Sequence, residues 1–376
     1  MLIATGCAGD EPDRGFSIDG DDPGRIEEFA AGFQDRHDAP GLAWAVIRNG
    51  RLVVADAVGS ADLAGTETMR PDHRFRIASV SKLVTGAAAV AGSDAGWLEL
   101  DSGVTDLLAV PNPSIDERID DITVGHLLDH RAGWRLSGFP EDPLFRNVEI
   151  ASDLGVALPP SPDDLTNWAM AQQLDFMPGS EYHYTNIGYV VLGRVLESAA
   201  DAAYEDLATR WVLDPSGITG ASLAGITRDE RLPGEVEYQS FPSAMWESVL
   251  DGSADVPEPA YGGLNLEGFD ASSAWVMSPI DMARLGAALD GNGDYPDIVS
   301  PTALSRLVDT PDEWSYSGGM AGSSSFLARL QDGTIVALAA NTFGDEDFFE
   351  DFVFGFLYAV EGVARWPDRD LFPEFQ

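Results

Sequence analysis

The sequence predicts an α+β fold: an antiparallel sheet flanked by the N- and C-terminal helices, with a mostly helical subdomain inserted between the two halves of the sheet. Apolar, β-branched runs flank Asn49-Gly50 and Asp332-Gly333, and such dipeptides are typical of hairpin turns. An amphipathic pattern precedes the first hairpin and another follows the second. Between the hairpins, apolar residues recur at helical spacing. Helix, hairpin, helices, hairpin and helix in this order favour one sheet covered by helices.

The first part of the sheet unit is residues 25–78. Within residues 25–37, apolar residues at helical spacing predict an amphipathic helix; they are Ile26, Phe29, Ala30 and Phe33. Residues 41–61 then predict a β-hairpin with its turn at Asn49-Gly50. This half therefore supplies one helix and two strands.

The second part of the sheet unit is residues 271–376. Residues 324–342 predict a hairpin around Asp332-Gly333. Residues 345–366 predict a closing helix, which begins with acidic residues that suit a helix N-terminus. The intervening residues 79–270 contain helical patterns interrupted by polar loops, and they are expected to form the helical subdomain. We see no internal repeat, and we treat residues 25–376 as a single catalytic domain.

The chain is strongly acidic: it contains 22 Lys and Arg residues and 63 Asp and Glu residues, so the formal net charge is −41. Such a surface repels nucleic acid and anionic membranes, so neither is an expected partner. Two explanations stay open. The acidity suits a protein kept soluble in concentrated salt, or it reflects a genome that favours Arg over Lys together with a solvated acidic surface.

The first residues suggest an anchor outside the cytoplasm. Cys7 is the only cysteine, so it forms no internal disulfide, and its context "MLIATGCAGDEP" resembles the end of a bacterial lipoprotein signal, where the cysteine is lipidated. Residues 1–24 are polar and acidic, as in a disordered tether. No run approaches the ~18 apolar residues of a transmembrane helix. We expect an extracytoplasmic protein with a lipid anchor at Cys7, or else a chance match.

The stretch "FRIASVSKLVTG" holds the only lysine of the chain, Lys82, three residues after Ser79. At the start of a helix, residues i and i+3 share a face, so the amine lies within reach of the serine hydroxyl. A serine needs a neighbouring base to become a strong nucleophile. Lysine can lose its proton when it is buried, whereas arginine stays charged. The alternative is that Ser79 caps the helix and Lys82 lies on the surface.

Further motifs follow in a defined order. "ITVGHLLDHRAGW" follows the Ser-x-x-Lys stretch, and Tyr184-Thr185-Asn186 lies 105 residues after Ser79. With these motifs the chain resembles the penicillin-recognising serine hydrolases, and within them the branch of class C β-lactamases, family VIII esterases and D-aminopeptidases. The resemblance spans residues 25–360 and implies a β-lactamase/transpeptidase-like fold.

The resemblance also implies roles for the tyrosine motif. Tyr184 would face the Ser79–Lys82 pair and relay the proton between Ser79 and the leaving group. Asn186 would orient the carbonyl or amide of the substrate. Without the resemblance, Tyr184 is one of several aromatic residues near the start of a helix.

The third motif of the family departs from its pattern here. The family carries a cation or His, then Thr or Ser, then Gly, and the best match is Tyr316-Ser317-Gly318-Gly319. A phenol at Tyr316 replaces the group that binds a substrate carboxylate. By resemblance, the backbone N–H groups of Ser79 and Gly319 form the oxyanion hole.

These motifs predict a serine hydrolase that forms an acyl-enzyme at Ser79 on small neutral esters or amides. β-Lactamase or D-alanyl-D-alanine carboxypeptidase activity is the second hypothesis. A non-catalytic surface module that binds a cell-wall fragment is a third, from another class. No cofactor is implied, because no phosphate loop or dinucleotide motif is present.

Two metal-like patterns carry little weight. His126 and His130 stand four residues apart, which on a helix suits zinc, but no third ligand is evident. Residues 290–297 begin like a calcium loop, yet Tyr295 occupies the position that requires Gly. We therefore expect no metal site.

Overall fold

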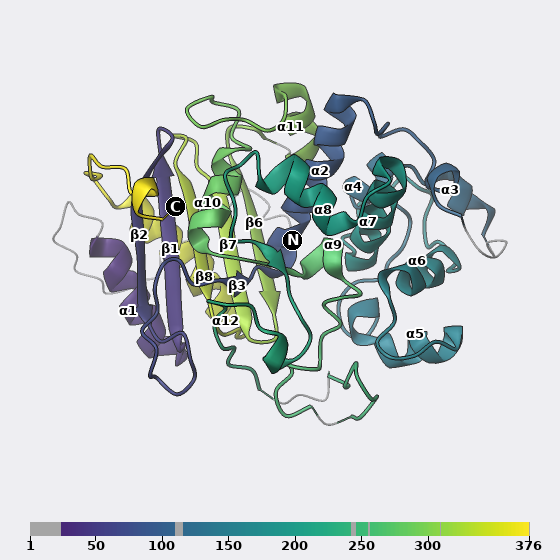
Figure 1. The fold of residues 1–376 in the computed structure, drawn as a ribbon, viewed down its shortest axis with the longest axis horizontal. Coiled ribbons are helices and arrows are strands. Elements are labelled where there is room, and N and C mark those ends of the chain that lie inside the picture. Colours follow the sequence, from purple (N-terminus) through teal and green to yellow (C-terminus); the bar gives the residue numbers. More distant parts are fainter. Residues whose placement is uncertain (1–23, 110–115, 242–245, 255, 309, 376) are drawn as a thin grey trace, which may run out of the picture.

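The computed structural model describes residues 24–109, 116–241, 246–254, 256–308 and 310–375. At its centre lies a five-stranded sheet with the order β2-β1-β8-β7-β6, and every pair of neighbours is antiparallel (Figure 1). The strands are β1 (Gly41–Arg48), β2 (Arg51–Gly59), β6 (Trp314–Met320), β7 (Ser323–Arg329) and β8 (Ile335–Ala340). The first hairpin thus joins three strands from the far end of the chain, and the α+β prediction is confirmed.

Both predicted hairpin turns are present. Asn49 and Gly50 connect β1 to β2 with φ angles of 50° and 69°, a pair of positive values that few other residues adopt without strain. Gly333, with φ of 80°, lies in the longer turn between β7 and β8. Each glycine thus supplies a backbone conformation that lets its hairpin close.

The two faces of the sheet pack against different layers. Along β1, Leu42, Trp44 and Val46 lie in one apolar cluster with the terminal helices, whereas Ala45 and Ile47 lie in the other. This alternation is the two-residue period of a strand with both faces buried. The terminal helices are α1 (Gly24–His37), α12 (Glu346–Glu350) and α13 (Phe356–Glu361), with a π-helical turn between the last two.

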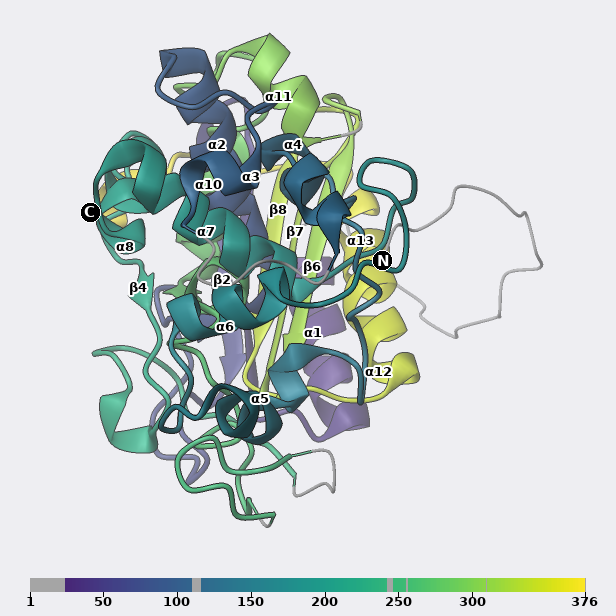
Figure 2. The same cartoon turned by 90° about the vertical axis from the view of Figure 1, so that its right-hand side faces the viewer.

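The opposite face is covered by α10 (Pro279–Ala287), and the remaining helices gather beside the β6 edge (Figures 1 and 2). These helices are α2 (Ser81–Ala95), α3 (Val104–Leu107), α4 (Val124–Leu128), α5 (Asn147–Leu154), α6 (Pro162–Met170), α7 (Asn186–Ala200), α8 (Tyr204–Ala208), α9 (Asp270–Ser273) and α11 (Pro301–Leu307). Their apolar faces form one core with α10 and the sheet. Among the described residues of 214–269, in contrast, only β4 (Ser222–Leu223) and one short 3-10 turn are regular.

The irregular segment is fixed by a buried arginine. Arg76, on the short strand β3 (Phe75–Arg76), pairs with Glu235 at 3.3 Å and lies 4.7 Å from the ring of Tyr238. Its guanidinium also donates to the Gly225 and Ala260 carbonyls. Strand β3 pairs with β5 (Trp275–Met277), which also pairs with β4. The chain just before Ser79 is therefore rigidly anchored.

The structure does not test the predictions made for the first residues or for the subdomain boundaries. Residues 1–23, which include Cys7, lie outside the described residues, and Gly24 is the first residue of α1 rather than the last of a tether. The subdomain boundaries at 78/79 and 270/271 stay predictions. Within the described part of the chain, no helix combines the length and the hydropathy that a bilayer crossing requires.

Candidate active site

Ser79 lies in a 3-10 turn, Ala78–Val80, that leads directly into α2. Ala78 has a φ of +47°, a left-handed conformation that side chains rarely adopt and that stores about 1–3 kcal/mol of strain. Strand β7 holds this turn, because Ser323 donates to the Arg76 carbonyl at 2.6 Å and Ser325 to the Ile77 carbonyl at 2.7 Å. The turn presents Ser79, which remains partly exposed.

Lys82 is 2% exposed and lies beneath Ser79. Its Nζ atom lies 3.4 Å from Ser79 Oγ, 2.8 Å from Asn186 Oδ1 and 2.9 Å from the carbonyl oxygen of Ser272 on α9. The buried Arg194–Asp270 pair, at 2.6 Å, ties α7 to α9 and so fixes that carbonyl. Burial lowers the pKa of Lys82 to about 7, although the nearby Asp142 carboxylate opposes this shift.

The three partners of Lys82 define where its lone pair points. A neutral amine has two N–H bonds, and the oxygens of Asn186 and Ser272 accept both of them because neither oxygen carries a proton. Ser79 Oγ, at 3.4 Å, is the third contact of Nζ, so the lone pair of the neutral amine is left for the serine hydroxyl. The neutral amine is therefore arranged to take the hydroxyl proton of Ser79.

The lowered pKa of Lys82 makes a prediction about pH. We expect acylation of Ser79 to accelerate with rising pH through a midpoint near 7 and then to level off, because only the neutral amine has a free lone pair. The measurement is the burst of p-nitrophenol from an activated ester over roughly pH 5 to 9. Since Lys82 is the only lysine, isotope labelling of lysine gives one NMR signal for a parallel titration. A midpoint near the ordinary lysine value would contradict the prediction.

Tyr184 lies on the other side of Ser79. Its hydroxyl is 2.7 Å from Ser79 Oγ and 3.3 Å from Asn186 Oδ1, and its ring centroid is 4.9 Å from Lys82 Nζ. Burial raises the pKa of Tyr184 well above the usual phenol value, so it is a protonated phenol at neutral pH. Ser79, Lys82, Tyr184 and Asn186 thus meet within hydrogen-bond reach, although residues 79 and 184 are far apart in sequence.

The two histidines do not share a helix face, because α4 ends at Leu128 and His130 has a φ of +55°. His126 instead closes a capping box with Thr123 at the start of α4. His130 packs its ring 4.6 Å from that of Tyr184, and burial lowers its pKa to about 3, so it is neutral. Among the described residues, no cluster of three or more His, Cys, Asp or Glu side chains suits a metal ion.

Asp142 is a site residue that sequence reasoning missed. It is 3% exposed, lies in the loop before α5, and accepts a 2.7 Å hydrogen bond from Asn186 Nδ2. Burial raises its pKa to about 6, against the opposing effects of hydrogen bonds from Leu144 and Asn186 and of the Lys82 charge. The Asp142-Pro143 dipeptide marks a helical cap, but nothing in the sequence places it beside residue 186.

The residues of the third motif all lie on β6, the edge strand beside Ser79. A Cβ atom on Gly318 would lie 2.4 Å from the Ile77 carbonyl and 2.9 Å from the Ser79 nitrogen, so glycine permits this close approach. Tyr316 donates its hydroxyl to the Leu307 carbonyl at 3.1 Å. Gly319 packs against the ring of Phe343, and Ser317 is partly exposed.

The close approach of Gly318 to the Ser79 turn predicts what a methyl group at position 318 would do to stability and activity. A Gly318→Ala variant is expected to push β6 away from the Ser79 turn, which destabilises the protein by about 1–3 kcal/mol and slows acylation about tenfold. Denaturant unfolding and burst kinetics measure the two effects. Gly24→Ala is the matched control, because nothing lies within 4 Å of a Cβ there. Equal behaviour of the two variants would show that the approach of β6 is not critical.

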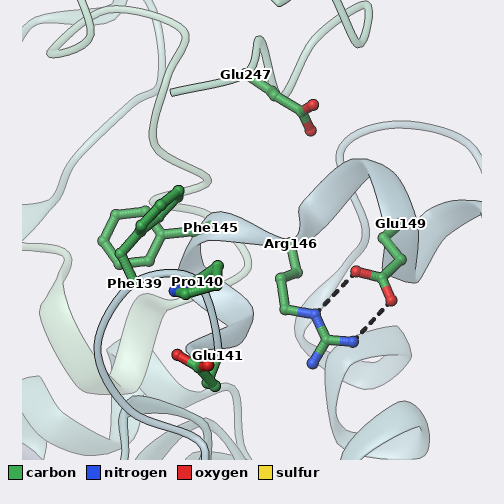
Figure 3. A pocket seen from close by; sticks show the side chains of 7 residues that line it. All are labelled: Phe139, Pro140, Glu141, Phe145, Arg146, Glu149 and Glu247. Atoms are coloured by element: carbon green, nitrogen blue, oxygen red, sulfur yellow. Dashed lines mark hydrogen bonds and ion pairs between the residues drawn. The ribbon is translucent and has the colours of Figure 1, made fainter. Parts of the chain in front are cut away.

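A hollow of about 400 Å³ lies on the Asp142 loop (Figure 3). Its lining residues are Phe139, Pro140, Glu141, Phe145, Arg146, Glu149 and Glu247. The rings of Phe139 and Phe145 meet edge to face at 5.6 Å, and Arg146 pairs with Glu149 at 2.7 Å. Ser79, Lys82 and Tyr184 are not part of the lining, so this hollow adjoins the site through its loop and is not the reacting centre.

Fold and motifs place the chain in a known family. The family model named Beta-lactamase matches residues 26–359, and the chain belongs to the beta-lactamase family. This confirms the resemblance found in the motifs.

Known proteins resemble this chain in sequence and in structure. "Putative fimbrial assembly protein FimD, serogroup D" of Dichelobacter nodosus is 30% identical over 208 residues, which are 54% of this chain and 48% of that protein. The chain spans about half the length of the first curated relatives it matches. The D-amino acid amidase of Ochrobactrum anthropi SV3 superposes with a TM-score of 0.68 at 20% identity, covering 90% of this chain and 96% of that one. A beta-lactamase/D-alanine carboxypeptidase of Yersinia pestis has a TM-score of 0.67 at 18% identity, covering 91% and 98%. At these identities the structural likeness shows the fold.

Proposed function

We propose that this chain is a serine hydrolase that forms an acyl-enzyme at Ser79 and acts on small neutral esters or amides. The observation that carries the proposal is the buried amine of Lys82, which lies 3.4 Å from Ser79 Oγ and has two further oxygen acceptors for its N–H bonds. Hydrolases among the proteins of similar fold, such as the Ochrobactrum anthropi amidase, agree with this reaction class.

The proposed reaction begins when Ser79 Oγ attacks the substrate carbonyl carbon and its proton passes to Lys82 Nζ. The tetrahedral oxyanion collapses, the bond to the leaving group breaks, and Tyr184 gives its phenol proton to the departing oxygen or nitrogen. The ammonium of Lys82, 4.9 Å from the ring centroid, stabilises the phenolate left behind. Water then attacks the carbonyl carbon of the ester on Ser79, and the phenolate of Tyr184 takes the proton of that water. The bond to Ser79 Oγ breaks as Oγ takes a proton back from the Lys82 ammonium, which releases the acid and restores the starting site.

The oxyanion requires two N–H donors, and we assign them to the backbone of Ser79 and Gly319. The near contact between Gly318 and the Ser79 nitrogen supports this assignment, because it brings β6 against the nucleophile turn. Asn186 is assigned to the substrate carbonyl or amide as well as to Lys82.

Charge argues for neutral substrates. Tyr316 supplies no positive charge at the position where the family binds a carboxylate, and its hydroxyl already donates to Leu307. The adjoining hollow carries three glutamates and one arginine, and the net charge of the chain is −41. Together these repel anionic substrates, so penicillins and peptides with a free carboxylate fit less well than neutral acyl compounds.

Two alternative functions each have one observation in their favour. β-Lactamase or D-alanyl-D-alanine carboxypeptidase activity is favoured by the named activity of the Yersinia pestis protein. A non-catalytic surface module that binds a cell-wall fragment is favoured by the missing cation at Tyr316. The hydrogen-bonded arrangement of Ser79, Lys82 and Tyr184 opposes the second alternative.

Two covalent probes test the proposal. We expect a fluorescent phosphonate to label the protein and a fluorescent penicillin to leave it unlabelled, with no phosphonate label on a Ser79→Ala variant. Label from both probes supports a penicillin-recognising enzyme instead. Label from neither, or equal labelling of Ser79→Ala, overturns the serine hydrolase assignment. A panel of p-nitrophenyl esters, a chromogenic cephalosporin and D-amino acid amides then defines the substrate.

We further propose that the protein works outside the cytoplasm and is lipid-anchored at Cys7. The Ala-Thr-Gly-Cys sequence, followed by a stretch rich in acidic residues, supports this location. Detergent partitioning of the protein from its own cells, compared with a Cys7→Ala variant, tests the anchor. Equal partitioning of both forms would refute it.

A further inference from the structure

We propose that Asp142 is a positioning residue of this site: it orients the Asn186 side-chain amide so that the amide oxygen, and not the nitrogen, faces Lys82. The proposal rests on the proposed function, because it explains how Lys82 becomes available to Ser79. It is carried by a continuous chain of contacts. Asp142 Oδ2 accepts from Asn186 Nδ2 at 2.7 Å, and Asn186 Oδ1 accepts from Lys82 Nζ at 2.8 Å.

In its ionised form, Asp142 determines the orientation because a carboxylate has no proton to donate. Both of its oxygens are engaged, since Oδ1 accepts from the Leu144 backbone N–H at 2.9 Å and Oδ2 accepts from Asn186. Only the NH₂ side of the Asn186 amide is able to face such a group. The planar amide then places its oxygen on the opposite side, toward Lys82.

The orientation decides whether Lys82 acts as a base. With the amide oxygen facing it, the neutral amine donates a hydrogen bond to Asn186 Oδ1 and keeps its lone pair for Ser79 Oγ. With the amide reversed, Nδ2 would donate into that lone pair, and the amine would be occupied. The reversed amide would also point its N–H group toward the Lys82 ammonium that forms when Ser79 loses its proton. Two donors would then face each other, so the ammonium would be less stable.

The surroundings make Asp142 a firm support. It is 3% exposed and caps the 3-10 turn Pro143–Phe145, so its position is fixed by the backbone. The titratable groups that face Lys82 and Asn186 from the packed elements are Tyr184 before α7, Tyr189 on α7 and the neutral His130 after α4. Among the described residues, Asp142 is therefore the carboxylate that acts on this pair.

An Asp142→Asn variant tests the proposal directly. The oxygen of the new amide is expected to keep the Leu144 cap, so its NH₂ group faces Asn186 and forces that amide to reverse. We expect acylation by an activated ester to fall about 100-fold while KM changes less than about threefold. We also expect the NMR titration midpoint of Lys82 to move to lower pH, because the ammonium loses both a nearby anion and an acceptor.

The direction in which the Lys82 titration midpoint shifts distinguishes a positioning role of Asp142 from a general loosening of the site. If water entered a loosened site, the Lys82 midpoint would rise toward its ordinary value, and this result would overturn the proposal. Unchanged acylation with an unchanged midpoint would also overturn it. Asp116→Asn is the matched control, because Asp116 is another buried aspartate that caps a 3-10 turn, Glu117–Asp121, with Arg118 and Leu174 among its partners.

A second variant covers the case in which Asp142→Asn fails to fold. Asp142→Ser keeps a capping oxygen for Leu144 but is too short to hold Asn186, so the amide is free to adopt either orientation. We expect acylation to fall about tenfold, with the Lys82 midpoint again lowered; wild-type values for both would overturn the proposal. If the parent chain itself shows no acylation, the proposed function fails, and the Lys82 midpoints in parent and variants still test the positioning role.

Discussion

A Lys82→Met variant is expected to fold like the parent chain and to acylate Ser79 about 10²–10⁴-fold more slowly. Methionine has nearly the length of lysine and suits a position that is 2% exposed, so the change removes the amine without opening a large cavity. The loss follows from the absence of a base near Ser79 Oγ. The rate of phosphonate labelling measures it, and circular dichroism verifies the fold.

The control for this prediction is the pH dependence of the residual rate. Without Lys82, the rise through a midpoint near 7 should disappear, because the group that titrates there is gone. A variant that acylates at the parental rate, or that keeps the same pH profile, would show that another group accepts the proton. His130 is a poor substitute, since burial lowers its pKa to about 3.

The sequence predicted the parts of the site that local spacing determines. Ser79 and Lys82 follow from a three-residue spacing at a helix start and from the scarcity of lysine. Arginine occupies the other Lys/Arg positions, and the buried Arg76 and Arg194 form ion pairs with Glu235 and Asp270. Such a guanidinium stays charged, whereas a buried lysine loses its proton near neutral pH. The scarcity of lysine therefore drew attention to the basic side chain that the structure places 3.4 Å from Ser79 Oγ, while its chemical role stays a prediction.

The contacts that fold the chain back on itself could not be predicted. Lys82 bonds to the Ser272 carbonyl across 190 residues, and Asp142 meets Asn186 across 44 residues. No local pattern encodes such distances, because they depend on how α2, α7 and α9 pack together. The hairpins at Asn49-Gly50 and Asp332-Gly333 were predictable for the opposite reason, since their turns are set by adjacent residues.

The proposed roles of Lys82 as the base and Tyr184 as the acid also depend on the structure. Both groups lie beside Ser79, but burial moves their pKa values in opposite senses. It lowers that of Lys82 to about 7 and raises that of Tyr184 above the phenol range. A pair of titratable groups separated in this way assigns the base and the acid. Lys82 is thus suited to accept a proton and Tyr184 to donate one.

A Tyr184→Phe variant is expected to separate these roles through the leaving group of the substrate. Phenylalanine keeps the ring beside His130 and Lys82 and removes only the hydroxyl that lies 2.7 Å from Ser79 Oγ. For alkyl esters and amides, whose leaving groups must be protonated as they depart, we expect acylation to fall about 10²–10⁴-fold. For p-nitrophenyl esters, whose leaving group departs as a stable anion, we expect the acylation rate to fall by less than about tenfold. Burst kinetics on substrates with the same acyl group measure both acylation rates.

The Lys82→Met variant supplies the contrast, because loss of the base slows attack by Ser79 whichever group leaves. Its rate should fall by a similar factor for p-nitrophenyl and alkyl esters, whereas that of Tyr184→Phe should depend steeply on the leaving-group pKa. If Tyr184→Phe slowed both substrate types equally, the phenol would act on Ser79 rather than on the leaving group. The proton that Tyr184 holds at neutral pH argues for the leaving group, since a phenol that burial keeps protonated has a proton to give and little capacity to take one.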